Sequence, residues 1–296
     1  MRYLSILGVL LSLSCFGQIT LYTVHPDNNL ANGIIGEEHV VLNVSFAGSK
    51  DAIAGFELQH PAGLIDRGIL LSTGNAFHPT NGVGGVNSIE NAGIDNFAGH
   101  NPLFENFINL GPGVGSFNSA ALNIVFAAGS DSLVIPYFFG SDEYPEFVDS
   151  DFGDAVCFFI REFGTENYIN LSPATIDYVG VQTINFGTAN NGPCVNCNFY
   201  MENPQGEVLQ FDGLTTVLQA RHPLVHGTKY EMTIVISDVG DAKYDSGVFI
   251  QGCENCTLKA NENQSIEDIK VFPNPAKNLL NIDLGSSQIK GQSIRI

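Results

Sequence analysis

Hydrophobic residues in this chain occur in short runs, and several of these runs alternate with polar residues at a period of two. This alternation is typical of β-strands, because successive side chains of a strand point to opposite faces of its sheet. Gly, Pro, Asn and Asp separate the runs, as they do where turns connect strands. The pattern predicts strands at residues 19–24, 40–46, 53–58, 68–72, 121–127, 132–139, 155–161, 168–171, 208–211, 230–237 and 248–252.

One segment has helical spacing instead. Leu30, Ala31, Ile34 and Ile35 recur at intervals that place them on one face of a helix, and Gly36 is a typical residue at which a helix ends. No alternation of strands and helices follows this segment. The sequence therefore predicts an all-β fold, an antiparallel β-sandwich or jelly-roll-like domain with one short N-terminal helix.

The longest gap between predicted strands, residues 73–115, is rich in Gly, Asn and Pro. A loop of this length inside a compact domain is usually functional or packed by its own side chains. Phe77, Phe97, Phe104 and Phe107 are scattered through it. We interpret them as apolar anchors of the loop; the alternative is a platform on which a ligand stacks.

The N-terminus has the features of an export signal. Arg2 precedes an apolar stretch that is too short to span a membrane, and Gly17 is a small residue at the point where that stretch ends. This predicts a signal peptide over residues 1–17, an extracellular location and no transmembrane segment in the mature chain. Cys15 leaves a lipoprotein signal open as an alternative.

The composition changes again near the C-terminus. Residues 257–268 are polar and predict a linker between the β domain, residues 18–256, and a partial β segment, residues 269–296. Strand-like runs recur in that last segment at residues 279–284 and 293–296.

Five cysteines follow the predicted signal peptide. Cys194 with Cys197, and Cys253 with Cys256, form two CxxC pairs. Export favours disulfides, within each pair or between the pairs, and the sequence does not choose among the three pairings. Zinc binding is the alternative, although the pairs are much farther apart than in usual zinc sites. Cys157 lies among apolar residues, which predicts a buried, inert thiol.

The charge of the chain is strongly acidic, with a formal net charge of -19. Nucleic acids and anionic membranes are therefore disfavoured as partners, which leaves cations or neutral partners such as glycans. Six of the carboxylates fall within residues 142–154, and no Lys or Arg occurs between Arg67 and Arg161. Carboxylates crowded in this way need full solvation, raised pKa values or a bound cation.

A second acidic group lies in an Asp/Gly-rich turn before the last predicted strand. Closely spaced oxygen ligands on a flexible backbone are what calcium requires, although a turn supported by Asx hydrogen bonds is the simpler alternative. Two such groups in one exported domain predict bound calcium. The predicted ligands are Glu143, Glu146 and Asp154 in the first group and Asp238, Asp241 and Asp245 in the second, which forms a second or a shared site. Asp149 and Asp151 are expected to face solvent.

An enzyme is the competing class of function. Glu143 and Glu146 have the chemistry of an acid and base pair for glycoside hydrolysis, but neighbours this close in sequence seldom lie across a cleft. No GxSxG, HExxH or P-loop pattern occurs. His222 and His226 flank Pro223, and we expect both in a loop. The sequence therefore predicts a protein without catalytic residues, and a secreted carbohydrate-active hydrolase is the alternative.

Four stretches of sequence resemble one known family. They are GILLSTGNA at 68–76, FGSDEYPEFV at 139–148, FDGLTTVL at 211–218 and ISDVGDAKYDSGVF at 236–249. In their residues and in their order along the chain, these four motifs resemble the choice-of-anchor L family of bacterial surface domains. The resemblance implies an exported β domain joined to a C-terminal anchor, and it implies no particular ligand or reaction.

The tail resembles a second known element. VFPNPA at 271–276 and NLL at 278–280 are similar to the start of a type A sorting domain of the type IX secretion system. That resemblance implies the type IX machinery as a partner. Taken together, these features predict a secreted or cell-surface, calcium-stabilised module for adhesion or ligand binding, with an extracellular glycan or protein as its ligand.

Overall fold

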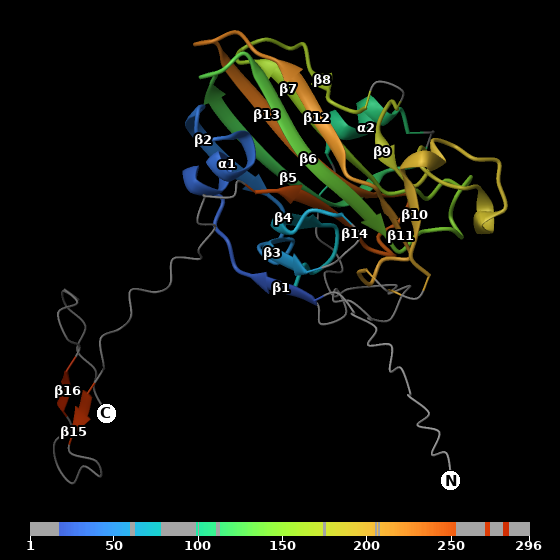
Figure 1. Ribbon diagram of the computed structural model, residues 1–296, viewed down its shortest axis with the longest axis horizontal. Coiled ribbons are helices and arrows are strands. Elements are labelled where there is room, and N and C mark those ends of the chain that lie inside the picture. Colours follow the sequence, from blue (N-terminus) through green and yellow to red (C-terminus); the bar gives the residue numbers. More distant parts are fainter. Residues whose placement is uncertain are drawn as a thin grey trace, which may run out of the picture. The chain divides into compact units, whose positions relative to one another are not determined.

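The computed structural model describes residues 18–59, 63–77, 99, 101–110, 113–173, 176–204, 206, 208–252, 270–272 and 281–283. Contacts divide the chain into two compact units, residues 1–258 and residues 259–296. In the described part of the first unit the secondary structure is mainly two antiparallel sheets, so the predicted all-β sandwich is confirmed (Figure 1).

Among the described residues, eight strands form the first sheet, in the order β1-β3-β4-β14-β6-β11-β10, and β12 also pairs with β6. Their bounds are Gln18–Tyr22 (β1), Ile53–Gln59 (β3), Arg67–Ser72 (β4), Ser246–Gln251 (β14), Ser132–Ser141 (β6), Gly213–Thr215 (β11), Tyr200–Glu202 (β10) and Leu218–Pro223 (β12). The central strand β6 pairs with three others, which makes it the main support of this layer.

Six strands form the second sheet in the described part of the chain, in the order β2-β5-β13-β7-β8, and β9 also pairs with β7. Their bounds are Val40–Ala47 (β2), Ser116–Ala127 (β5), Lys229–Val239 (β13), Ala155–Glu162 (β7), Ile169–Asn170 (β8) and Val179–Gly180 (β9). Strand β13 is hydrogen-bonded to β5 on one side and to β7 on the other over most of its length.

The main core lies where apolar side chains of the two sheets meet. Tyr137 of β6 and Phe158 of β7 are both almost fully buried, and their ring centroids are 4.3 Å apart. The helix α1, Asn28–Ile35, adds its apolar face to the same cluster, as the helical spacing predicted. The side chain of Asp27 caps this helix by accepting hydrogen bonds from the backbone N–H groups of Asn29 and Leu30.

Strand β7 is apolar on both faces. One face lies in the main core, and a second helix covers the opposite face. This helix, α2, spans Pro102–Ile108, and its Phe104 packs in one cluster with Cys157 and Phe159 of β7. Phe107 contacts Phe159 with ring centroids 5.3 Å apart. The prediction of a single helix was therefore wrong. A seven-residue helix within a Gly-rich and Asn-rich region has too few turns to produce a periodic signal.

Two of the anchors predicted for the long loop are confirmed, and a third, Phe107, is 40% exposed although its ring contacts Phe159. Phe104 is fully buried and Phe77 packs against a core cluster, whereas Phe97 lies outside the described residues. Residues 208–211 form bends instead of the predicted strand, and β11 begins only at Gly213. The short strands β9 and β10 and the longer β12 were not predicted from the sequence.

Two short 3-10 helices, Thr188–Asn190 and Cys197–Phe199, precede β10. In the second unit, β15 (Lys270–Phe272) pairs with β16 (Asn281–Asp283) in an antiparallel ladder, and β16 falls inside a predicted strand. The predicted signal peptide, residues 1–17, and the predicted linker, residues 257–268, lie outside the described residues. No helix within the described residues is long and apolar enough to cross a membrane.

Candidate functional site

The two acidic groups predicted from the sequence lie on two neighbouring connections between the sheets. Residues 142–154 lead from β6 of the first sheet to β7 of the second, and residues 240–245 lead from β13 of the second sheet to β14 of the first. Because β6 pairs with β14 and β7 pairs with β13, both connections lie at the same end of the sandwich. We refer to residues 142–154 and 238–245 together as the acidic corner.

Hydrogen bonds to the carboxylate of Asp154 join the two sheets at this corner. Its Oδ1 accepts a hydrogen bond from the backbone N–H of Val239, 3.1 Å away, and its Oδ2 accepts one from the hydroxyl of Ser246, 2.6 Å away. The backbone N–H of Asp154 in turn donates to Oε2 of Glu143 at 2.7 Å. The start of β7, the end of β13 and the start of β14 are therefore fixed relative to one another.

Asp238 and Asp142 carry buried oxygens that lack a well-aligned hydrogen-bond partner. Asp238 is 0% exposed, and its Oδ2 accepts a hydrogen bond from Nδ2 of Asn118 at 2.8 Å, but its Oδ1 accepts none. Asp142 is 1% exposed, and its carboxylate has only poorly aligned contacts, with the side chain of Gln210 and the backbone of Asp212, which lower its pKa in part. Buried polar atoms are nearly always paired in folded proteins, so both residues require an explanation.

Burial is the main cause of the altered acidity of these groups. It raises the pKa values of Asp142, Glu143 and Asp154 well above their ordinary values. For Asp238, burial together with the charge of Asp245 raises the pKa to about 8. These four side chains are thus not solvated. The repulsion among their negative charges is therefore relieved by bound protons or by a bound cation.

The predicted calcium ligands divide into two groups by burial. Glu143, Asp154, Asp238 and Asp245 are buried in the corner, whereas Glu146 is exposed. Asp241 is partly exposed, and its Oδ1 accepts a hydrogen bond from the backbone N–H of Lys243 at 3.1 Å, which is an Asx turn. Asp149 and Asp151 are exposed, as predicted.

The described residues contain no group of three or more His, Cys, Asp or Glu side chains that could hold a metal ion. A calcium site in the corner therefore needs amide or backbone oxygens as well, which calcium accepts. Two carboxamides, those of Asn118 and Gln210, have buried oxygens without partners. Neither was found from the sequence, because an isolated Asn or Gln carries no signal there.

The sequence comparison identifies the family. The family model described as the Choice-of-anchor L domain matches residues 20–254. The chain belongs to this family. The family membership indicates a secreted or cell-surface module, which agrees with the location expected from the sequence. Comparisons with curated proteins and with solved structures gave no match.

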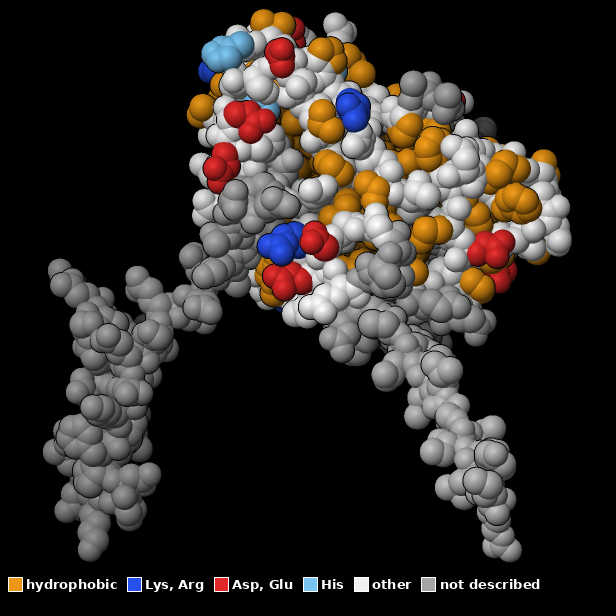
Figure 2. Space-filling model, in the orientation of Figure 1, with side chains coloured by type: hydrophobic (Ala, Val, Ile, Leu, Met, Phe, Trp, Pro, Cys, Tyr) orange, Lys and Arg blue, Asp and Glu red, His pale blue; other side chains and the backbone are white. Residues whose placement is uncertain are grey.

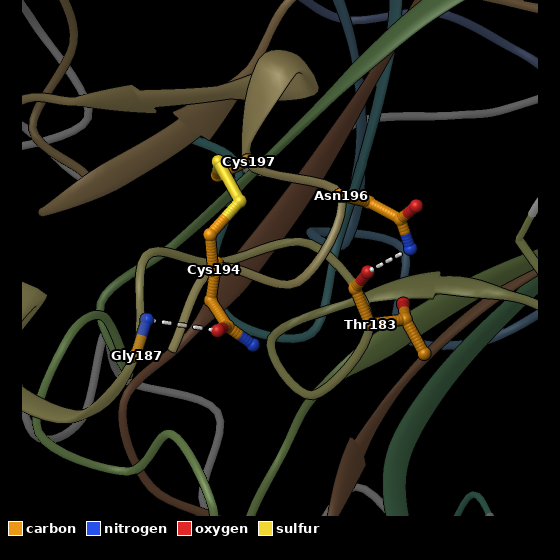
Figure 3. The surroundings of a disulfide bond; sticks show 6 residues. Thr183, Gly187, Cys194, Asn196 and Cys197 are labelled. Carbon is orange, nitrogen blue, oxygen red and sulfur yellow. Dashed lines mark hydrogen bonds between the residues drawn. A yellow bond between two sulfur atoms is a disulfide. The ribbon is translucent and has the colours of Figure 1, made fainter. Parts of the chain in front are cut away.

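The Choice-of-anchor L domain contains a disulfide within its first CxxC pair. Cys194 and Cys197 are bonded, and the neighbouring Asn196 donates a hydrogen bond to the carbonyl of Thr183 at 2.9 Å (Figure 3). Both sulfurs of this pair are thus used in the bond. Cys253 and Cys256 lie outside the described residues. Cys157 is free and fully buried, as predicted, and burial raises the pKa of its thiol.

A cavity of about 460 Å³ lies at a different place in the domain, beside the end of β7 and the end of β12. Its lining includes Arg161, Asn167, Ile169, His222, Val225 and Tyr230. The expectation that His222 lies in a loop was wrong, because it is part of β12. A cavity of this size falls within the range of small-ligand sites, and Ile169 and Val225 add exposed apolar surface to it.

The net negative charge is not gathered into one patch on the face that Figure 2 draws. Asp and Glu side chains form several small, separate groups there, between broad areas of apolar and neutral side chains. This face therefore offers no concentrated acidic surface to a cationic partner.

Proposed function

We propose that this Choice-of-anchor L domain is an exported module that binds a ligand or mediates adhesion outside the cell, and that calcium stabilises it at the acidic corner. The observation that carries the proposal is the burial of the carboxylates that connect the two sheets. Carboxylates in this position support the fold, whereas catalytic carboxylates need access to a substrate. Glu143 is 1% exposed and is bonded to the backbone of Asp154, while Glu146 is exposed.

Calcium suits the corner for two reasons. Its charge offsets the repulsion among buried carboxylates, and its irregular coordination accepts carboxylate, carboxamide and backbone oxygens together. An affinity of about 0.1 to 1 mM is enough outside the cell. At about a hundredfold excess over the dissociation constant, the ion would add about 2.7 kcal/mol to the free energy of unfolding.

The ligand is an extracellular glycan or protein, and export proceeds through the type IX machinery. The net charge of -19 favours a neutral or cationic ligand over nucleic acid. The cavity beside β12 supports binding of a small polar group, since Asn167 and His222 offer hydrogen-bond donors next to apolar side chains, whereas Arg161 already donates to Glu231 and to the carbonyl of Thr165.

A glycan-array screen of the purified chain, with calcium and then with chelator, tests the binding function. We expect binding to one class of glycan that His222→Ala weakens. An array without any bound glycan, together with no binding to extracellular matrix proteins, would contradict the proposal. Hydrolysis of a glycan that Glu143→Gln abolishes without unfolding would support the hydrolase instead.

A further inference from the structure

The cavity beside the end of β7 and the end of β12 offers polar groups that the fold leaves unused. Neither the carboxamide of Asn167 nor the imidazole of His222 forms a hydrogen bond with another described residue. Burial lowers the pKa of His222 from its ordinary value, so this imidazole is uncharged at pH 7 and has one donor and one acceptor. A carboxamide also has both. The two side chains therefore suit a ligand with hydroxyl groups, because a hydroxyl donates and accepts as well.

Arg161, the one Lys or Arg in the described lining of the cavity, is already neutralised. Its Nε and Nη2 donate hydrogen bonds to Oε2 of Glu231 at 2.7 and 2.5 Å, and its Nη1 donates to the carbonyl of Thr165 at 2.6 Å. Its guanidinium carbon lies 4.3 Å from the centre of the Tyr168 ring. The donors with which arginine binds carboxylates or phosphates are thus occupied by the protein itself.

The other charges around the cavity are mostly negative. Glu162 lines it, and Oε2 of the exposed Glu166 lies 3.7 Å from Nη1 of Arg161. Arg221 and Lys229 each precede a lining residue in their strands, so their side chains point to the opposite faces. An anionic ligand would therefore meet like charges in the cavity, which opposes its binding.

The apolar wall of the cavity is held in place by hydrogen bonds. Ile169 and Val225 line it, and they are 50% and 63% exposed. The backbone N–H of Val225 donates to the hydroxyl of Tyr230 at 3.0 Å, and the carbonyl of Val225 accepts from the N–H of Thr228, also at 3.0 Å. A fixed apolar wall beside a few polar groups is the usual form of a small-ligand site. It also matches a sugar ring, which has an apolar face of C–H groups and hydroxyls at its edge.

We propose that this cavity binds an uncharged sugar unit of a glycan and excludes sugars that carry a carboxylate or a sulfate. Asn167 and His222 bond to the hydroxyls of the sugar, and Ile169 and Val225 pack against its apolar face. The inference rests on the proposed binding function and narrows its ligand to one class of glycan.

A glycan array of matched pairs tests the assignment, each pair being a neutral glycan and its sialylated or sulfated counterpart. The purified full chain in calcium should bind the neutral member at least about tenfold more tightly, since like charges oppose the acidic one. Isothermal titration with the best neutral glycan then compares the wild type, Asn167→Ala and His222→Ala. We expect each substitution to weaken binding by about threefold to tenfold, as the loss of one hydrogen bond does. The matched control His226→Ala, an exposed residue that does not line the cavity, should retain the wild-type affinity.

Circular dichroism checks the fold of each variant, and if one of the two cavity variants is unfolded, the other decides the question. Equal or tighter binding of the acidic glycans would overturn the assignment, and so would wild-type affinity in every folded cavity variant. Both results would leave glycan binding as a function of the domain. A wild type that binds no glycan would also overturn this inference, whereas the proposed function would then depend on extracellular matrix proteins as ligands.

Discussion

The buried carboxylates of the corner predict an unusual pH dependence, in which the metal-free domain becomes less stable as the pH rises. Asp238 is the best-defined case, with its pKa raised to about 8 by burial and by Asp245. An unfolded Asp titrates near pH 3.9, as a rough reference. Between these values the folded state binds more protons than the unfolded state, so the stability that Asp238 contributes is complete below about pH 4 and is lost as the pH approaches 8.

The size of the effect follows from proton linkage. One proton bound in the folded state alone changes the free energy of unfolding by about 1.4 kcal/mol per pH unit. From pH 5 to pH 8, Asp238 therefore accounts for at most about 4 kcal/mol. The neighbouring Glu143 and Asp154 also have raised pKa values, so their contributions have the same sign.

Urea denaturation in chelator, followed by circular dichroism at pH 5, 6, 7 and 8, measures this slope. Asp238→Asn should make it shallower, whereas the exposed control Asp151→Asn should retain it. Calcium should also reduce the slope, because the ion stabilises the ionised carboxylates. A wild-type stability that stays constant or increases from pH 5 to pH 8 in chelator would refute the reasoning.

Three further predictions concern side chains in β7 or directly before it. Asp154→Ala removes two hydrogen bonds between buried groups and should lower the free energy of unfolding, measured by urea denaturation, by about 2 to 4 kcal/mol. A loss below about 1 kcal/mol would contradict the role of Asp154 in joining the two sheets. Phe158→Ala should cost about 3 to 5 kcal/mol by the same measurement, because it opens a cavity against Tyr137, and a loss under 1 kcal/mol would argue against that packing. The Cys157 thiol should react with a thiol reagent only after unfolding, and a fast reaction in the native state would show that it is accessible.

The strands were predictable where alternation was clear and burial one-sided, or where an apolar run was bounded by turn residues. Strand β7 is an example of the second kind, and apolar side chains cover both of its faces. The sequence did not identify α2 as that cover, since a helix of seven residues produces too short a pattern. Residues 208–211 were mistaken for a strand because the buried Leu209 and Phe211 alternate with polar residues in a segment that is bent.

The acidic corner was only partly predictable. The sequence identified both acidic groups, but it could not determine that they lie together, because sheet topology sets the contact between residues about 90 positions apart. The sequence also could not tell which carboxylates are buried. Glu143 and Glu146 are neighbours in one motif, but Glu143 is buried in the corner and Glu146 is exposed at the surface.

Thermal unfolding of the purified chain at pH 7, in calcium and then in chelator, tests the central claim most directly. A stabilisation of about 2.7 kcal/mol at a hundredfold excess of calcium over its dissociation constant corresponds to a rise of about 5 to 11 °C for a domain of this size. Magnesium at the same concentration should give a smaller rise. Identical transitions in calcium and in chelator would contradict the claim that calcium stabilises the acidic corner.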